Sequence, residues 1–287
     1  MERIKAALEK ARAEKAQKAK QAQPVESVAV QTESVENERA EERTLQKQEK
    51  TLENLEYQQT RVTRLNYDHL EQRRIISFNK HNLLSNSFDL LRTQVLQKME
   101  QNGWKTLAIT SPTPEAGKTV IAINLAMSIA HQTDKTAMLV DFDLRKPKVG
   151  QYLGLDLDKS LNDYLDPKAS VNLEDIIINP QLPRFVVLPT AKKTENSSEV
   201  LSSSKVTNLI SELKSRYDDR YVIFDLPPLL NTDDAIAVLP QIDSVLMVVA
   251  NGGSTKQEIE ESMRHLPETN LLGVVLNKAE EVTHSYY

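Results

Sequence analysis

The sequence predicts an α/β protein: a doubly wound, mostly parallel sheet with helices on both faces, preceded by a helical and disordered N-terminal extension. Two observations lead to this fold class. From Ser85 onwards, short and continuously apolar runs alternate with amphipathic stretches, as expected for buried strands joined by crossover helices. The 287 residues, of which 39% are hydrophobic, also suffice for one domain of about 200 residues with extensions.

Each predicted element is an apolar or amphipathic run bounded by turn residues. Strands are expected at residues 105–110, 135–143, 184–190, 221–228, 244–250 and 271–278. Helices are expected at residues 87–99, 120–131, 199–217, 233–239 and 256–265. Because parallel strands end at the same edge of a sheet, ligand-binding side chains should lie just beyond the carboxyl ends of these strands.

Composition divides the chain into four parts. Residues 1–20, rich in Ala, Glu, Lys and Arg, predict a basic amphipathic helix that either docks on a partner or anionic membrane surface or stays solvated. Residues 21–84 are expected to be a linker and a charged helical strap, in which the basic pair Arg73 and Arg74 has no legible function. The globular domain is expected at residues 85–278, and a C-terminal tail follows at residues 279–287.

Charge and composition exclude several classes of function. The net charge of −5 argues against a nucleic-acid-binding protein, which usually carries a basic face. The sequence has no cysteine, so disulfides, thiolate metal sites and a cysteine nucleophile are excluded. No apolar run approaches the ~18 residues that span a bilayer. We therefore expect a soluble, cytoplasmic protein, and we expect any association with a membrane to be peripheral.

The stretch SPTPEAGKT, residues 111–119, lies between a predicted strand and a predicted helix and has the features of a phosphate-binding loop. In such a loop, backbone N–H groups at the helix N-terminus hold the phosphates, the lysine reaches the β- and γ-phosphates, and the following hydroxyl ligates Mg²⁺. Pro112 stands where the strict motif has its first glycine, so the assignment depends on the flanking elements. The residues assigned to nucleotide binding here are Ala116, Gly117, Lys118, Thr119 and Val120.

Carboxylates follow two of the predicted strands. Asp141 and Asp143 stand in the run DFDLRKPK after AMLV, and Asp225 follows YVIF. A lone aspartate at a strand end is often only a helix cap or a turn residue. Three of them on one edge of a sheet, beside a phosphate-binding loop, indicate metal and phosphate chemistry. Mg²⁺ prefers carboxylates, water and phosphate oxygens, and phosphoryl transfer needs a carboxylate to orient the nucleophile.

Taken together, the loop SPTPEAGKT, the run LVDFDLRKP, the strand end VIFDLPP and the closing GVVLNK resemble the bacterial tyrosine kinases of polysaccharide export. Those ATPases belong to the same P-loop branch as the chromosome-partitioning and division-site-selection ATPases. The resemblance covers residues 85–278, and the DxDxR run is its most specific part. The family's loop usually has a glycine where this chain has Glu115, whose charge is unfavourable beside a triphosphate.

The resemblance implies a role for each matching residue. Lys118 would bind the phosphates of ATP, Thr119 would ligate Mg²⁺, and Asp225 would be the metal carboxylate of the second motif. Asp141 and Asp143 would position the metal and activate the attacking hydroxyl. The implied catalytic set is therefore Lys118, Asp141 and Asp143, and the implied metal residues are Thr119, Asp141 and Asp225.

The resemblance also implies a reaction, its acceptors and its partners. The reaction would be ATP-dependent tyrosine autophosphorylation in exopolysaccharide biosynthesis or export, with Tyr286 and Tyr287 as phosphoacceptors. Asn277 would lie near the adenine, or would simply end the last strand. The implied partner is a membrane-embedded polysaccharide co-polymerase of the chain-length-determinant type. A homo-oligomer is implied as well, although the family's ring-forming pattern of one acidic residue and two arginines reads Asn86, Asp89 and Arg92 here.

Two other functions remain open. A partitioning or site-selection ATPase would use ATP hydrolysis as a dimerisation switch and would phosphorylate nothing. Such switches usually carry a second lysine early in the loop, which this loop lacks, so the kinase is favoured. A nucleotide-binding scaffold without catalysis is the third function, suggested by Pro112 and Glu115. Lys118→Ala would abolish ATP turnover by either enzyme and leave the partner binding of a scaffold intact.

Overall fold

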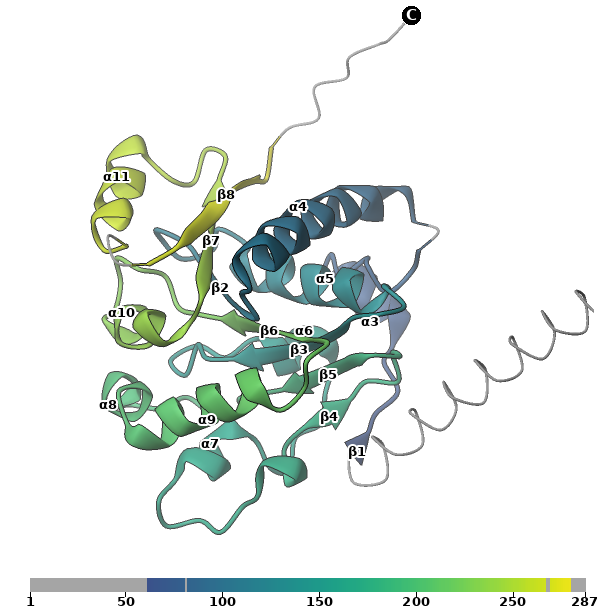
Figure 1. Ribbon diagram of the computed structural model, residues 1–287, viewed down its shortest axis with the longest axis vertical. Coiled ribbons are helices and arrows are strands. Elements are labelled where there is room, and N and C mark those ends of the chain that lie inside the picture. The colour runs from purple at the N-terminus through teal and green to yellow at the C-terminus, as the bar shows by residue number, and fades with distance from the viewer. Residues whose placement is uncertain (1–60, 81, 267–268, 280–287) are drawn as a thin grey trace, which may run out of the picture. The chain divides into compact units, whose positions relative to one another are not determined.

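The computed structural model describes residues 61–80, 82–266 and 269–279 and contains the eight-stranded sheet shown in Figure 1. The strands are β1 (Arg61–Val62), β2 (Thr106–Thr110), β3 (Thr136–Asp141), β4 (Ile178–Asn179), β5 (Phe185–Leu188), β6 (Arg220–Asp225), β7 (Ser244–Ala250) and β8 (Leu271–Asn277). Their order is β1-β4-β5-β3-β6-β2-β7-β8. Neighbouring strands run parallel except β4 and β5, so the predicted mostly parallel sheet is confirmed.

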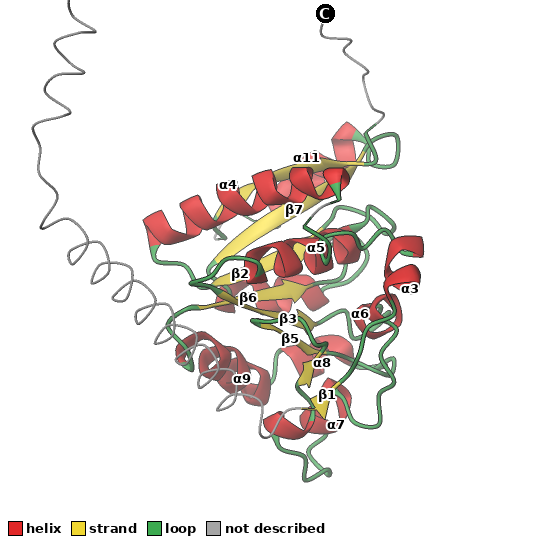
Figure 2. Cartoon of the chain, turned by 90° about the vertical axis from the view of Figure 1, so that its right-hand side faces the viewer, coloured by secondary structure: helices red, strands yellow, loops and turns green. Residues whose placement is uncertain are grey.

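Helices cover both faces of this sheet, as Figure 2 shows. The helices are α3 (Tyr67–Gln72), α4 (Asn86–Asn102), α5 (Lys118–Ala130), α6 (Val149–Leu153), α7 (Leu161–Leu165), α8 (Ser197–Leu201), α9 (Ser204–Ser215), α10 (Asp234–Val238) and α11 (Lys256–Arg264), with short 3₁₀ turns at Leu83–Ser85, Leu173–Asp175 and Leu239–Gln241. Helices α4 and α5 pack in one apolar cluster on one face, and α9 and α10 pack in a second cluster on the other.

Alternation along each strand supplies the two clusters. In β2, Leu107 and Ile109 join the cluster with α5, while Ala108 between them joins the other. In β6, Ile223 faces α5 and its neighbour Phe224 faces α9. Because both faces are covered, these strands read as continuous apolar runs, which is why the sequence predicts them well.

One predicted helix is wrong in its extent. The run expected as a single helix over residues 199–217 forms two helices, α8 and α9, that meet at Ser202 and Ser203. The Ser202 hydroxyl donates to the carbonyl of Ser198 at 2.8 Å, and the Ser203 hydroxyl accepts from the N–H of Val206. Serine hydroxyls that bind nearby backbone groups compete with helical hydrogen bonds and favour a cap, so the helix restarts here.

Residues 63–80, which we call the α3 segment, precede the predicted domain boundary at residue 85 and nevertheless pack against the domain. Leu70 and Ile75 are fully buried in the cluster around α5, and Leu65 is nearly so. The packed core therefore extends upstream of the predicted start of the globular domain. The helix predicted at residues 1–20 lies outside the described residues, as do residues 21–60 of the predicted linker and strap.

Candidate functional site

The predicted phosphate-binding loop follows the end of β2 and enters α5 at Lys118. Gly117, at the helix N-cap, has a φ of 92°. A Cβ atom built on Gly117 would lie 2.2 Å from the side-chain nitrogen of Asn277, which itself donates to the carbonyl of Ala116 at 2.8 Å. The left-handed backbone therefore favours glycine at position 117, and a side chain there would also have to displace the amide of Asn277.

The Lys118 side chain points to the carboxyl edge of the sheet. Its Nζ lies 3.0 Å from an oxygen of Asp143, and both side chains are largely buried. Burial alone lowers the pKa of Lys118, but the carboxylates of Asp225 and Asp143 raise it by more, so this pKa lies above its ordinary value. The loop lysine is therefore an ammonium held among carboxylates.

Thr119 and Asp225 form the second contact between the loop and this edge. Thr119 Oγ1 donates to Asp225 Oδ2 at 2.6 Å. The other oxygen of Asp225, Oδ1, is buried and has no hydrogen-bond partner among the described residues. Burial raises the pKa of Asp225 to about 6. A carboxylate oxygen without a donor, beside a threonine hydroxyl, fits Mg²⁺ or one of its waters.

Asp141 lies next to Asp225 because β3 and β6 pair in register at these two residues. Asp141 Oδ2 accepts from the N–H groups of Lys148 and Val149 at 3.1 and 3.0 Å, and Oδ1 accepts from the N–H of Asp143 at 3.3 Å. Burial, and then the Asp225 charge, raise the pKa of Asp141 well above its usual range. The contacts of Asp141 hold the turn that carries Asp143, and ligation of a metal by Asp141 stays a prediction.

Charge at this edge is unbalanced. Asp141, Asp143 and Asp225 lie around the ammonium of Lys118, and repulsion among these carboxylates contributes to the raised pKa values of Asp141 and Asp225. A divalent cation would restore the balance. Within the described ranges no group of three or more His, Cys, Asp or Glu side chains is arranged to hold a metal by itself. The ion would therefore complete its shell with phosphate oxygens and water.

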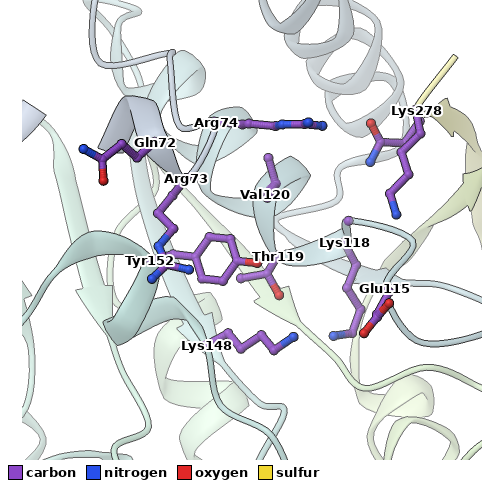
Figure 3. Close-up of a pocket in the computed structure, with 12 residues that line it drawn as sticks. Gln72, Arg73, Arg74, Glu115, Lys118, Thr119, Val120, Lys148, Tyr152 and Lys278 are labelled. Atoms are coloured by element: carbon purple, nitrogen blue, oxygen red, sulfur yellow. The ribbon is translucent and has the colours of Figure 1, made fainter. Parts of the chain in front are cut away.

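The loop opens into a pocket of about 410 Å³, whose walls are shown in Figure 3. Most of the charged side chains that line it are cationic: Arg73, Arg74, Lys118, Lys148 and Lys278, against one carboxylate, Glu115. Thr119, Val120 and Asn277 also line the pocket. A cavity of this size with a helix N-terminus and several cations suits a polyanionic ligand such as a nucleoside triphosphate.

Several lining residues were not predicted from the sequence: Arg73, Arg74, Lys148, Tyr152 and Lys278. The basic pair at residues 73 and 74 is visible in the sequence, but nothing in its spacing indicates that the α3 segment folds back over α5. Lys278 follows Asn277 directly, so the strand-end argument applied to Asn277 could have included it.

The two departures from the strict loop motif have a structural account. The carbonyl of Pro112 accepts from the N–H of Leu230 at 3.1 Å, so the first half of the loop rests on the segment after β6. Glu115 has a φ of 64°, in the left-handed region that glycine favours, and its side chain lines the pocket. Glu115 therefore keeps the glycine conformation of the loop while adding a negative charge.

Comparison with known proteins decides the family. Residues 104–267 match the family described as an AAA domain. The tyrosine-protein kinase CpsD of Streptococcus agalactiae is 30% identical over 202 residues, which cover 69% of this chain and 85% of CpsD. The chain belongs to the bacterial tyrosine kinase family of P-loop ATPases. Its fold matches the kinase domain of the Escherichia coli tyrosine kinase ETK with a TM-score of 0.63 and 29% identity, over 71% of this chain and 80% of that one.

Other members of the family are much longer. The tyrosine-protein kinase Ptk of Acinetobacter johnsonii is 29% identical over 72% of this chain, but the chain spans only 28% of Ptk. A more distant likeness within the P-loop ATPases is the cell division ATPase MinD of Pyrococcus furiosus, with a TM-score of 0.51 and 25% identity over 60% of this chain and 71% of MinD.

Arg92 of the ring-forming pattern and Arg145 of the DxDxR run both form hydrogen bonds to other residues of this chain. On α4, Arg92 donates to Asp89 at 2.8 Å, and Ser128 of α5 donates to the same carboxylate at 2.6 Å. Arg145 of the DxDxR run donates through Nε and one terminal nitrogen to the buried Asp234, each at 3.1 Å.

The predicted acceptors, in the tail at residues 286 and 287, lie outside the described residues. Among the described helices, none combines the length and the apolar character needed to cross a bilayer.

Proposed function

We propose that this domain transfers the γ-phosphoryl group of MgATP to tyrosine hydroxyls, with Tyr286 and Tyr287 of another copy as acceptors. The process it serves would be exopolysaccharide biosynthesis or export. The observation that carries the proposal is the meeting of Lys118 and Thr119, at the start of α5, with Asp143 and Asp225 at the carboxyl edge of the sheet. Membership of the bacterial tyrosine kinase family supports this reaction over other uses of ATP.

The loop residues bind the phosphates. Backbone N–H groups at the N-terminus of α5 and the ammonium of Lys118 attract the triphosphate, and Lys118 leaves Asp143 to reach it. Thr119 and Asp225 would hold Mg²⁺, with Asp141 beside them. When bound, the ion neutralises charge on the β- and γ-phosphate oxygens.

The transfer itself is a displacement at phosphorus. The tyrosine oxygen forms a bond to the γ-phosphorus, the bond to the oxygen that bridges the β- and γ-phosphorus breaks, and ADP leaves with that oxygen. The tyrosine proton passes to a carboxylate. Asp143 suits this task better than Asp141, because its Oδ2 becomes free once Lys118 turns to the phosphates, whereas both oxygens of Asp141 accept backbone hydrogen bonds.

Incubation of the purified chain with γ-labelled ATP and Mg²⁺, followed by mapping of phosphotyrosine by mass spectrometry, tests the proposal. The assay is run with and without the cytoplasmic tail of the co-polymerase partner. We expect label at Tyr286 and Tyr287, and none in Lys118→Ala. A chain that forms no phosphotyrosine even with the tail present would contradict the proposal.

A partitioning-type switch is the second candidate, and the fold likeness to MinD favours it. Such a switch would release phosphate from ATP and change its dimerisation without labelling any tyrosine. The same assay separates the two candidates, because labelled phosphate then appears only in solution.

We also infer the setting of the reaction. ATP is supplied in the cytoplasm, so the domain would work there, held at the inner face of the membrane by a polysaccharide co-polymerase. Support for this partner comes from the resemblance to the export kinases. Co-purification of the chain with the membrane fraction only when the co-polymerase is present is the expected result, and equal recovery without it would contradict the inference.

A further inference from the structure

The α3 segment is tied to the nucleotide-binding helix by one buried amide. Asn124 of α5 is fully buried. Its side-chain oxygen accepts from the N–H groups of Ile76 and Ser77 at 2.8 and 2.9 Å, and its nitrogen donates to the carbonyls of Arg74 and Val120 at 3.0 and 2.9 Å. All hydrogen-bonding positions of this amide are used, so it holds the backbone around Arg74 at a set place above α5.

The backbone at Arg74 has a conformation that arginine rarely adopts. At the end of α3, the N–H of Ile75 donates to the carbonyl of Leu70, and the N–H of Arg74 donates to the carbonyl of Glu71, both at 2.9 Å. This is the Schellman arrangement, whose left-handed position is usually glycine. Here Arg74 occupies it, with a φ of 60°. Such unfavourable conformations concentrate at functional sites, which points to a use for this side chain.

The Arg74 side chain crosses the pocket above Val120 and extends toward Lys278 on the opposite wall (Figure 3). No hydrogen bond or ion pair joins its guanidinium to another residue of the described ranges. Its neighbour Arg73 differs, since the Arg73 guanidinium lies 5.6 Å from the centre of the Tyr152 ring in a cation–π contact. Of the two arginines, Arg74 is the one available to a ligand.

We propose that Arg74 stacks on the base of the bound nucleotide, which makes the α3 segment a wall of the nucleotide site. The inference rests on the proposed use of ATP. With the triphosphate against the N-terminus of α5, the ribose and base must extend into the rest of the pocket, between Asn277 and Lys278 on one side and Arg74 on the other. A planar guanidinium stacks face to face on an aromatic ring, whereas a lysine ammonium approaches the ring only as a point charge. Asn124 is then a positioning residue for this contact.

The test compares two ligands and three variants by calorimetric titration of the full chain. ATP has a base, and inorganic tripolyphosphate does not. Arg74→Ala should weaken ATP binding about five- to tenfold, and Arg74→Lys should weaken it nearly as much because charge without a plane does not stack. Tripolyphosphate binding should stay within about twofold for both variants. Arg64→Ala, which removes an exposed arginine of the same segment outside the pocket, should match the unaltered chain for both ligands.

Other outcomes overturn the inference in distinct ways. If Arg74→Ala weakens ATP and tripolyphosphate equally and Arg74→Lys restores both, Arg74 contacts phosphate and not the base. If Arg74→Ala leaves ATP binding unchanged, Arg74 does not contact the nucleotide. If the unaltered chain binds no ATP, the proposed function itself fails. That failure differs from a failure of the stacking contact, because Lys118→Ala then has no effect on ATP binding either.

Arg74→Gly separates a ligand contact from a structural role. Glycine accepts the left-handed backbone at this position, so this variant should melt at a higher temperature than the unaltered chain. It should still bind ATP as weakly as Arg74→Ala does. A variant that melts higher and binds ATP normally would contradict the stacking contact.

Discussion

The two walls of the nucleotide pocket are built in different ways. On the sheet side, Lys118, Thr119 and Asp225 are mostly buried, come from the start of α5 and the end of β6, and are held by carboxylate contacts within the site. On the α3 side, Arg73 and Arg74 are exposed, and the backbone at Arg74 is held by Asn124. The wall proposed to perform the chemistry is thus part of the core, whereas the wall proposed to recognise the base is attached to it.

The largest expected effect lies on the sheet side. Lys118→Ala removes the ammonium that lies 3.0 Å from Asp143 and should lower phosphotyrosine formation by about 100- to 1,000-fold. Initial rates with γ-labelled ATP measure it. Lys256→Ala, which removes a lysine whose side chain is 90% exposed, is the matched control and should keep full activity. A Lys118→Ala rate within tenfold of the unaltered chain would show that this lysine does not stabilise the transferred group.

On the α3 side, the largest expected effect is on stability. Asn124→Ala leaves the N–H groups of Ile76 and Ser77 without their acceptor, which should lower the free energy of unfolding by about 2 to 4 kcal/mol. Urea denaturation measures the change. Asn102→Ala, at an exposed asparagine whose side chain donates to the carbonyl of Lys98, should change the free energy of unfolding by less than about 0.5 kcal/mol. Equal effects of the two substitutions would mean that the α3 segment is not anchored by Asn124.

The buried carboxylates should give the sheet side a pH dependence. The pKa of Asp225 rises from 3.8 to about 6 on folding, so the folded chain binds this proton more tightly than the unfolded chain. Without nucleotide, the contribution of Asp225 to stability should therefore fall as pH rises between about 4 and 6 and should not change further above that.

Asp225→Asn removes this titration and also removes the Asp225 charge that helps to raise the pKa of Asp141, so both changes act in the same direction. The stability of Asp225→Asn relative to the unaltered chain should increase by about 1 to 3 kcal/mol between pH 4 and pH 7. Urea denaturation across that range gives the difference. A relative stability that is flat or decreases with pH would contradict the raised pKa of Asp225.

The smallest expected effect concerns the loop between the two walls. Glu115→Gly removes both an unfavourable φ of 64° and a negative charge from the pocket, so it should stabilise the chain by about 1 kcal/mol and tighten ATP binding about threefold. Glu115→Gln removes the charge alone and should tighten ATP binding without raising the melting temperature. If both variants melt alike, the backbone at residue 115 is not strained.

The same contrast explains what the sequence could predict. Strands β2, β3, β6 and β7 are covered on both faces, so their apolar runs are visible without a structure. The aspartates at positions 141 and 225 end two of those runs and could be placed at one edge by topology alone. Strands β1 and β4 have two residues each, too few to show any periodicity.

The α3 wall could not be predicted in this way. Asn124 looks like one polar residue in an otherwise apolar helix, and the sequence does not say which distant N–H groups it accepts from. Arg74 occupies the position after a helix end where glycine is usual, so no glycine in the sequence indicates where α3 ends. Long-range contacts through single side chains leave no periodic pattern, which is why residues 63–80 were expected to belong to a linker and strap.

Phosphotyrosine mapping by mass spectrometry, on the protein isolated from its own cells, tests the central claim most directly. The unaltered chain should carry phosphate on Tyr286 and Tyr287, and the Lys118→Ala chain expressed in its place should carry none. Phosphotyrosine that persists in Lys118→Ala, or an unaltered chain that hydrolyses ATP and carries no phosphotyrosine, would contradict the claim that this site is a tyrosine kinase centre.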